Sequence, residues 1–183
     1  DLNAAVVHFE EAVSFQPNEP AFIENLALTY YQLELWDQAE TWYKKLLEFY
    51  PDNVDVIDMI ALSAFRKNNL EDAAMWYEKS ISIDNTSEEA HYNYAYIKSQ
   101  TGDYSKALEH YLVVVKMDPE NPRAHLGAAY MLAELAKKKE AKAAAIVAAN
   151  TPEVEEVEAP AEEEAEATAE APEAAADETP AAE

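Results

Sequence analysis

The residue types that most often carry catalysis are sparse in this chain. It has four histidines and no cysteine. Nucleophilic catalysis needs a serine or cysteine held against a base, and metal catalysis needs histidines and carboxylates that converge; neither arrangement is visible. Carboxylate pairs such as Asp55 and Asp58 are common on helix surfaces, and no acid or base stands opposite them. We therefore expect no catalytic residue, no metal site and no enzyme activity.

The histidines follow a period instead of forming a cluster. His91 and His125 are 34 residues apart, and His8 and His110 occupy a second position of the same period that tryptophan fills in between. A histidine at such a position is expected to be a half-buried packing residue. The chain also has only two glycines, too few for a glycine-rich phosphate loop, so we expect no cofactor.

An alanine recurs at the same interval, at Ala5, Ala39, Ala73, Ala107 and Ala141. Four residues after each of the first four comes an aromatic, namely Phe9, Tyr43, Tyr77 and Tyr111. Spacings of this kind place side chains on one stripe of a helix. A unit of 34 residues is too short to bury such a stripe alone, so the period predicts stacked helical pairs in which each repeat covers its neighbour.

Prolines and turn residues set the expected helix ends. The pattern predicts helices at 1–15, 20–33, 37–50, 54–67, 71–83, 88–100, 104–117 and 122–149. The last is expected to be one long helix, because Leu135-Ala136-Lys137 stands where the third repeat has Thr101-Gly102-Asp103.

Two segments carry a family resemblance. The segment from Gly102 to Tyr111, closed by Asp118-Pro119-Glu120-Asn121, resembles the second helix of a tetratricopeptide repeat, and the segment from Ala90 to Tyr96 resembles its first helix. The resemblance implies an all-α, right-handed solenoid of stacked antiparallel helix pairs. It divides the chain into a half-repeat at 1–19, full repeats at 20–53, 54–87 and 88–121, a degenerate capping repeat at 122–150, and a tail at 151–183.

Charge is unevenly distributed. The chain carries a net charge of −24, and residues 151–183 hold 13 acidic and no basic side chains. Because affinity for phosphate backbones comes from clustered lysine and arginine, this balance argues against nucleic acid as a partner. The one basic cluster, Lys137 to Lys139 with Lys142, is expected to be a solvated helix face. The tail is rich in Ala, Glu and Pro, so we expect it to be disordered. No stretch is long enough for membrane insertion.

The resemblance assigns the first helix of each pair to a concave face. The residues that it implies for partner binding there are Glu24, Leu28, Tyr31, Asp55, Asp58, Leu62, Phe65, Glu89, Tyr92, Tyr96 and Tyr130. Aromatic groups supply contact area and carboxylates select against acidic partners. We therefore expect a protein-interaction scaffold that binds a peptide segment, apolar or aromatic and neutral to basic. Family members that clamp the terminal carboxylate of an acidic peptide need basic residues where Glu24 and Asp58 stand. The sequence therefore disfavours that subclass.

Two other functions stay open. The chain could be a self-assembly module that uses an exposed face of a terminal helix, such as Val6, Phe9 and Val13. It could also be a regulatory or docking domain of a larger enzyme or membrane protein, because the sequence starts inside a repeat and its native N-terminus is expected to lie upstream. This fragment contains no targeting segment, and its location stays open, with the cytoplasm slightly favoured.

Overall fold

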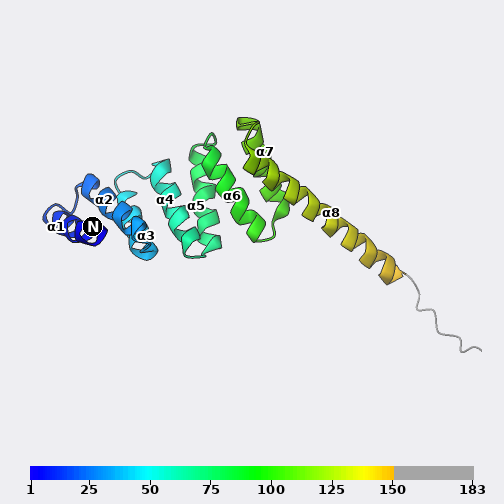
Figure 1. The fold of residues 1–183 in the computed structure, drawn as a ribbon, viewed down its shortest axis with the longest axis horizontal. Coiled ribbons are helices and arrows are strands. Elements are labelled where there is room, and N and C mark those ends of the chain that lie inside the picture. Colours follow the sequence, from blue (N-terminus) through cyan, green and yellow to red (C-terminus); the bar gives the residue numbers. More distant parts are fainter. Residues whose placement is uncertain (151–183) are drawn as a thin grey trace, which may run out of the picture.

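The computed structural model describes residues 1–150 as a row of eight helices (Figure 1). They are α1 (Leu2–Phe15), α2 (Pro20–Gln32), α3 (Trp36–Leu46), α4 (Val54–Arg66), α5 (Leu70–Ile83), α6 (Glu88–Gln100), α7 (Tyr104–Met117) and α8 (Pro122–Asn150). The described residues contain no strand, which confirms the all-α solenoid. The acidic tail at 151–183, predicted to be disordered, lies outside the described residues.

Consecutive helices pack against each other along the row. We call α2, α4, α6 and α8 first helices and α1, α3, α5 and α7 second helices, because α2–α3, α4–α5 and α6–α7 form the three complete pairs. Ala39, Ala73 and Ala107 have no exposed surface. The aromatics four residues later are 2–3% exposed, so the predicted stripe is the core. Small side chains let the paired helices approach closely while the aromatics fill the space beside them.

The first helices of the complete pairs end in the same way. Glu34, Asn68 and Gly102 all have positive φ, at 59°, 61° and 80°. The residue after each donates its backbone N–H to a carbonyl five residues earlier, as Asp103 does to Lys98 at 3.0 Å. This left-handed turn reverses the chain, and it suits glycine and asparagine better than other residues.

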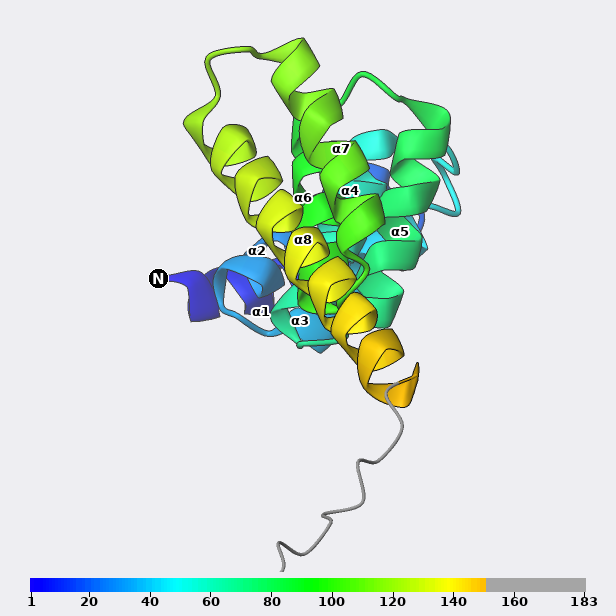
Figure 2. The ribbon, with the colours of Figure 1, turned by 90° about the vertical axis from the view of Figure 1, so that its right-hand side faces the viewer.

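The long terminal helix is confirmed. The position equivalent to Gly102 in the last repeat is Ala136, a strong helix former that disfavours positive φ, and α8 runs through it without a break. Figure 1 shows the C-terminal half of α8 projecting away from the row, and the end-on view shows α8 in front of the stack (Figure 2). Within residues 1–150, no helix combines the length and apolar character needed to cross a bilayer.

One helix end differs from the prediction by more than one residue. α3 was expected to run to residue 50 but ends at Leu46, and residues 47–49 form turns. Glu48 and Phe49 donate to carbonyls three residues earlier instead of four, at 3.2 and 3.1 Å. Pro51 lacks a backbone N–H and restricts the residue before it, so the last turn tightens ahead of it.

Candidate functional site

A groove crosses the first helices α4, α6 and α8. Four cavities adjoin along it, and neighbouring cavities share wall residues. The cavity at the start of α4 and α6 shares Leu62, Tyr77 and Asn93 with the central cavity. The central cavity shares Tyr92, Tyr96 and Arg123 with the cavity beside α8. We call them the acidic cavity, the aromatic cavity and the terminal cavity, with a fourth at the edge that holds Glu88 and Asn121. Because the walls are shared, the cavities form one continuous surface for an elongated ligand.

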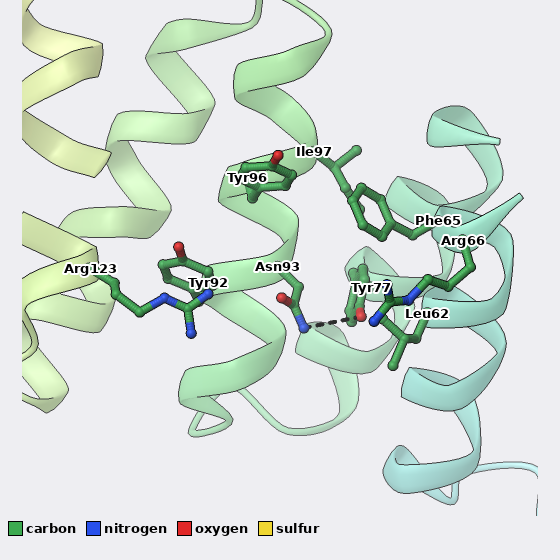
Figure 3. A pocket seen from close by; sticks show the side chains of 9 residues that line it. All are labelled: Leu62, Phe65, Arg66, Tyr77, Tyr92, Asn93, Tyr96, Ile97 and Arg123. Atoms are coloured by element: carbon green, nitrogen blue, oxygen red, sulfur yellow. Dashed lines mark hydrogen bonds between the residues drawn. The ribbon is translucent and has the colours of Figure 1, made fainter. Parts of the chain in front are cut away.

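The aromatic cavity has a volume of about 350 Å³ and lies between α4 and α6. Phe65 and Tyr96 meet edge to face in its wall, with ring centroids 5.8 Å apart. Figure 3 shows these two rings on one side of the cavity and Tyr92 with Arg123 on another. The Arg123 guanidinium lies 4.5 Å from the centre of the Tyr92 ring. A cation over a ring face is attracted by the ring quadrupole, so Arg123 holds Tyr92 in place.

Asn93 and Tyr77 form the floor of this cavity. The Asn93 amide donates a hydrogen bond to the Tyr77 hydroxyl at 3.1 Å (Figure 3). Tyr77 is 2% exposed, and its ring comes from the second helix α5 beneath the groove. The bond satisfies the buried hydroxyl, which would otherwise be costly.

The acidic cavity, of about 170 Å³, has Asp55, Asp58 and Glu89 in its wall. Burial is the main cause that raises the pKa of Asp58 to about 6, and the nearby carboxylates of Glu89, Asp55 and Asp84 add to it. The Ser80 hydroxyl opposes part of this rise. Even so, Asp58 Oδ1 and Ser80 Oγ are both buried without a partner at hydrogen-bonding geometry among the described residues. Asp58 is therefore a carboxyl group whose charged form is disfavoured by burial in the wall of this cavity.

The terminal cavity, of about 460 Å³, lies between α6 and α8. Gly127 is essential to its shape, since a Cβ there would lie 2.6 Å from the Tyr111 ring. Tyr111 also meets Tyr92 edge to face at 5.6 Å. The exposed Tyr130 borders the opening. This end of the groove is aromatic and carries Glu134 and Arg123 at its edge.

Eight of the eleven residues predicted for the concave face line these cavities. They are Asp55, Asp58, Leu62, Phe65, Glu89, Tyr92, Tyr96 and Tyr130. Glu24, Leu28 and Tyr31 on α2 line none of the four. Tyr31 instead packs edge to face on Trp36 of its own repeat at 4.9 Å, while Glu24 and Leu28 are exposed.

Tyr77 and Tyr111 belong to the groove although the sequence placed them only in the core. Their 34-residue spacing identified them as packing aromatics, and they are. What the period did not reveal is that each side chain, although 2–3% exposed, also forms part of a cavity wall in the groove. Gly127 was the available signal, as a glycine inside a helix often marks a close approach.

Two of the four histidines, the buried His91 and the half-buried His110, form a pair between α6 and α7. Nδ1 of His91 lies 2.8 Å from Nδ1 of His110, and Nε2 of His91 lies 3.1 Å from the backbone oxygen of Asn85. A neutral His91 donates from Nε2 to Asn85 and therefore accepts from His110. Burial lowers the pKa of His110, and the neighbouring His91 lowers it further. Neither histidine lines the groove.

His8 and His125 do not fit the expectation of half-buried packing residues, because both are exposed. His8 lies on α1 and His125 on α8, the two helices at the ends of the row. The neighbouring helices that bury His91 and His110 in the third repeat have no counterpart there among the described residues. In the described part of the chain, no group of three histidine, aspartate or glutamate side chains is placed to hold a metal ion.

Two family models match the sequence. A tetratricopeptide repeat model matches residues 22–53, and a model described as anaphase-promoting complex, cyclosome, subunit 3 matches residues 66–147. Together they cover most of the described helices. No curated protein matches the chain.

Solved structures share the fold at low sequence identity. A crystal structure of MamA protein is 18% identical with a TM-score of 0.70, covering 77% of both chains. A second structure of MamA is 18% identical with a TM-score of 0.65, covering 78% of this chain and 91% of that one. The first TPR of Spaghetti (RPAP3), bound to HSP90 peptide SRMEEVD, is 17% identical with a TM-score of 0.60, covering 64% and 93%.

Proposed function

Because this chain belongs to the tetratricopeptide-repeat family, we propose that it is a non-enzymatic scaffold whose concave groove binds a segment of another protein. The observation that carries the proposal is the continuity of the groove. Three cavities that share walls run across α4, α6 and α8, so one elongated ligand can contact three repeats at once. A scaffold built of repeats commonly offers such an extended surface.

The walls favour apolar and aromatic side chains in the ligand. Phe65, Tyr92 and Tyr96 surround the aromatic cavity, and Leu62 completes it. Aromatic residues supply large contact area at low entropic cost and dominate binding energies at many interfaces. A volume of about 350 Å³ is of the size that protein cavities use for a small ligand or a side-chain anchor.

The acidic cavity favours a basic side chain beside that anchor. Leu62, Tyr77 and Asn93 line both cavities, so the carboxylates lie next to the apolar site. A lysine or arginine would meet carboxylates of opposite charge at Asp55, Asp58 and Glu89, whereas an acidic ligand would meet like charge there. The structural neighbour bound to HSP90 peptide SRMEEVD holds an acidic ligand, and we propose the opposite charge preference here.

The absence of catalysis is part of the same proposal. His91 and His110 point their nitrogens at each other and at Asn85, and neither lines the cavities. The polar groups in the cavity walls are amides, phenols, carboxylates, guanidiniums and the Ser99 hydroxyl, which suit recognition.

A peptide array tests the ligand class. We expect the chain to select peptides that pair a lysine or arginine with an apolar residue, with affinity that falls as salt rises. Tyr92→Ala with Tyr96→Ala should weaken binding by at least about 1 kcal/mol, and Asp55→Lys with Asp58→Lys should slow association. Tyr50→Ala is the matched control, because Tyr50 is 48% exposed and lines none of the described cavities. Selection of acidic peptides would contradict the groove hypothesis. So would a ligand-binding footprint around Trp42 and Trp76, which lie on the second helices α3 and α5.

A further inference from the structure

His91 and His110, which we call the histidine pair, stand where the other repeats have apolar residues. The equivalent positions in the first two complete pairs hold isoleucine on the first helix and tryptophan on the second: Ile23 with Trp42, and Ile57 with Trp76. The fold therefore does not need histidines at this crossing. Of the three complete pairs, only α6–α7 has groups there that gain charge within a few pH units of neutrality.

The histidine pair can hold one added proton but not two. Nε2 of His91 donates to the Asn85 carbonyl at 3.1 Å, so Nδ1 of a neutral His91 accepts from Nδ1 of His110 at 2.8 Å. A proton added to His110 goes to its Nε2 and leaves this bond in place. A further proton on His91 would put a hydrogen on each Nδ1, pointing at the other, and would bring two charged rings to a centroid distance of 5.0 Å. Both effects oppose the contact.

The groups around the pair control how readily it takes up protons. Burial lowers the pKa of His110, and the neighbouring His91 lowers it further. The other charged groups that act on His110 come from α5 and α7: Glu109 and Glu78 favour its charged form, and Lys106 opposes it. The first proton is therefore hindered by burial but attracted by two carboxylates, whereas a second proton would also meet the charge of the first.

The remaining titratable neighbours lie on α6, on α8 and in the turn before α6. Tyr94 of α6 meets the His110 ring edge to face at 4.6 Å and has Lys98 over its own ring at 5.1 Å. On α8, which packs on both helices, Nε2 of His125 lies 2.8 Å from the Pro119 carbonyl oxygen. Asp84, next to Asn85, accepts hydrogen bonds from Thr86.

A second pair of rings continues the α6–α7 contact into the groove. Tyr92 follows His91, Tyr111 follows His110, and the two tyrosines meet edge to face at 5.6 Å. Both line the terminal cavity, and Tyr92 also lines the aromatic cavity. Tyr111 cannot move toward α8, because its ring already lies so close to Gly127 that a Cβ there would be 2.6 Å away. Separation of α6 from α7 at the histidines would therefore displace Tyr92.

We propose that the histidine pair is a pH-sensitive switch for the groove: it keeps the walls of the terminal and aromatic cavities in place at neutral pH, and its second added proton displaces them. With at most one added proton, α6 stays on α7 and Tyr92 stays on Tyr111. The second proton separates the imidazole rings, moves Tyr92 out of both walls and releases the ligand. The effect on a ligand rests on the proposed function of the groove, whereas the movement of Tyr92 does not.

The first test needs no ligand. Ring-nitrogen NMR signals of the full chain, followed from neutral to acidic pH, should show two separate steps for the histidine pair. The ring signals of Tyr92 and Tyr111 should stay constant through the first step and shift together with the second. Those of Tyr31, which packs on Trp36 in another repeat, should not follow that step. The switch is refuted if the Tyr92 and Tyr111 signals follow neither step or only the first, or if helix content is lost before the second.

The chain supplies its own matched variant. His91→Ile with His110→Trp installs the residues that the first two complete pairs have at this crossing, so it should fold and keep Tyr92 on Tyr111 as pH falls. His110→Gln should do the same, because a glutamine amide can donate to a neutral His91 or accept from a charged one. His125→Gln, at an exposed site, should respond to acid as the unmodified chain does. If both pair variants keep the response of Tyr92, the histidine pair does not cause it.

Peptide binding tests the regulation of the groove. The probe is the best binder of the peptide array with its basic residue replaced by glutamine, because Asp58 also takes up a proton in this range and its neutralisation would weaken a basic peptide. Affinity should fall by at least about fivefold across the second step in the unmodified chain and stay constant in the Ile–Trp variant. If neither the parent peptide nor the probe binds at neutral pH, the proposed function fails while the tyrosine signals still decide the switch. An equal fall in both proteins would show that the histidine pair does not regulate binding.

Discussion

Ala39, Ala73 and Ala107 set the spacing of their helix pairs. Each has no exposed surface and lies in a core cluster with residues of the first helix of its pair. The fifth alanine of the series, Ala141, is exposed on the projecting part of α8. The same residue at the same phase thus has a packing role in the three complete pairs and none at the end of the row.

This contrast gives the first prediction. Ala107→Leu should destabilise the protein by about 1–3 kcal/mol, because extra methylenes in a filled crossing force the helices apart. Ala141→Leu makes the same change at an exposed site and should leave the free energy of unfolding nearly unchanged. Urea unfolding of both variants provides the comparison, and an equal effect would show that Ala107 does not mark a close crossing.

Asp58 gives the second prediction at the residue scale. Its pKa is raised from 3.8 to about 6, so the folded state binds the proton more tightly than the unfolded state. The stability gained by that proton is fully present below the unfolded pKa and is lost as pH rises through about 6. Asp58→Asn should therefore stabilise the protein at neutral pH by about 1–3 kcal/mol, with a difference that disappears in acid.

The measurement is urea unfolding across this pH range, with Asp52→Asn on an exposed turn as the control. A second readout links stability to recognition: Asp58→Asn should weaken the binding of basic peptides while it stabilises the free protein. A variant that is less stable than the original at neutral pH would refute the assignment of Asp58 as a costly buried charge.

At the scale of elements, α6 and α7 are joined by the pair of His91 and His110. Because burial lowers the pKa of His110 below 6.5, the unfolded state takes up the proton first as pH falls. The contribution of His110 to stability is therefore present above about pH 6.5 and decreases below it. We expect the chain to lose stability there, by at most about 1.4 kcal/mol per pH unit from this group.

His110→Gln should flatten this pH dependence, whereas His125→Gln, at an exposed site, should not. Thermal unfolding between neutral and mildly acidic pH would show the difference. Because Asp58 changes stability in the opposite direction over an overlapping range, the comparison must be made between each variant and the unmodified chain at the same pH.

α8 gives the fourth prediction. The helix passes through Ala136, where the other first helices turn, so amide protection should be continuous from residue 126 to 140. Rapid exchange confined to residues 134–139 would instead indicate a turn and a folded-back second helix. Amide hydrogen exchange separates the two outcomes. Gly102 and its neighbours, which form a turn between α6 and α7, provide the internal reference for the exchange rate of a turn.

The helices were predictable because their signals are local. Gly102, the prolines and the alanine period mark the ends and the buried stripe within a few residues. The cavities were less predictable, because their walls come from three first helices and their floors from second helices. Tyr77 shows the limit: its period identifies a core residue, but only the packing of Asn93 above it reveals that its hydroxyl faces the groove. The end of α3 was predicted four residues too late, because Pro51 tightens the helical turn that precedes it.

At the scale of the whole molecule, the row has no single centre. Each helix packs mainly on its neighbours in sequence, so stability is close to a sum of repeat and interface contributions. The helices with a neighbour on both sides should open least often. We expect amide exchange to be slowest in α4 to α6 and faster in α1. A protein that unfolds only as one cooperative unit would not show this gradient of exchange rates. Equal global protection in all helices would contradict this.

The strict 34-residue period has a consequence for how such a chain can change in length. A duplicated copy of residues 88–121, inserted after residue 121, would present α7 to a new first helix of the kind it already contacts, and α8 would still follow a second helix identical to α7. The surfaces of α1 and α8 would be unchanged. The groove would become longer by one repeat, which carries its own copies of Tyr92 and Tyr96. Ligand length is therefore a quantity that this architecture can adjust in whole units without redesigning any interface.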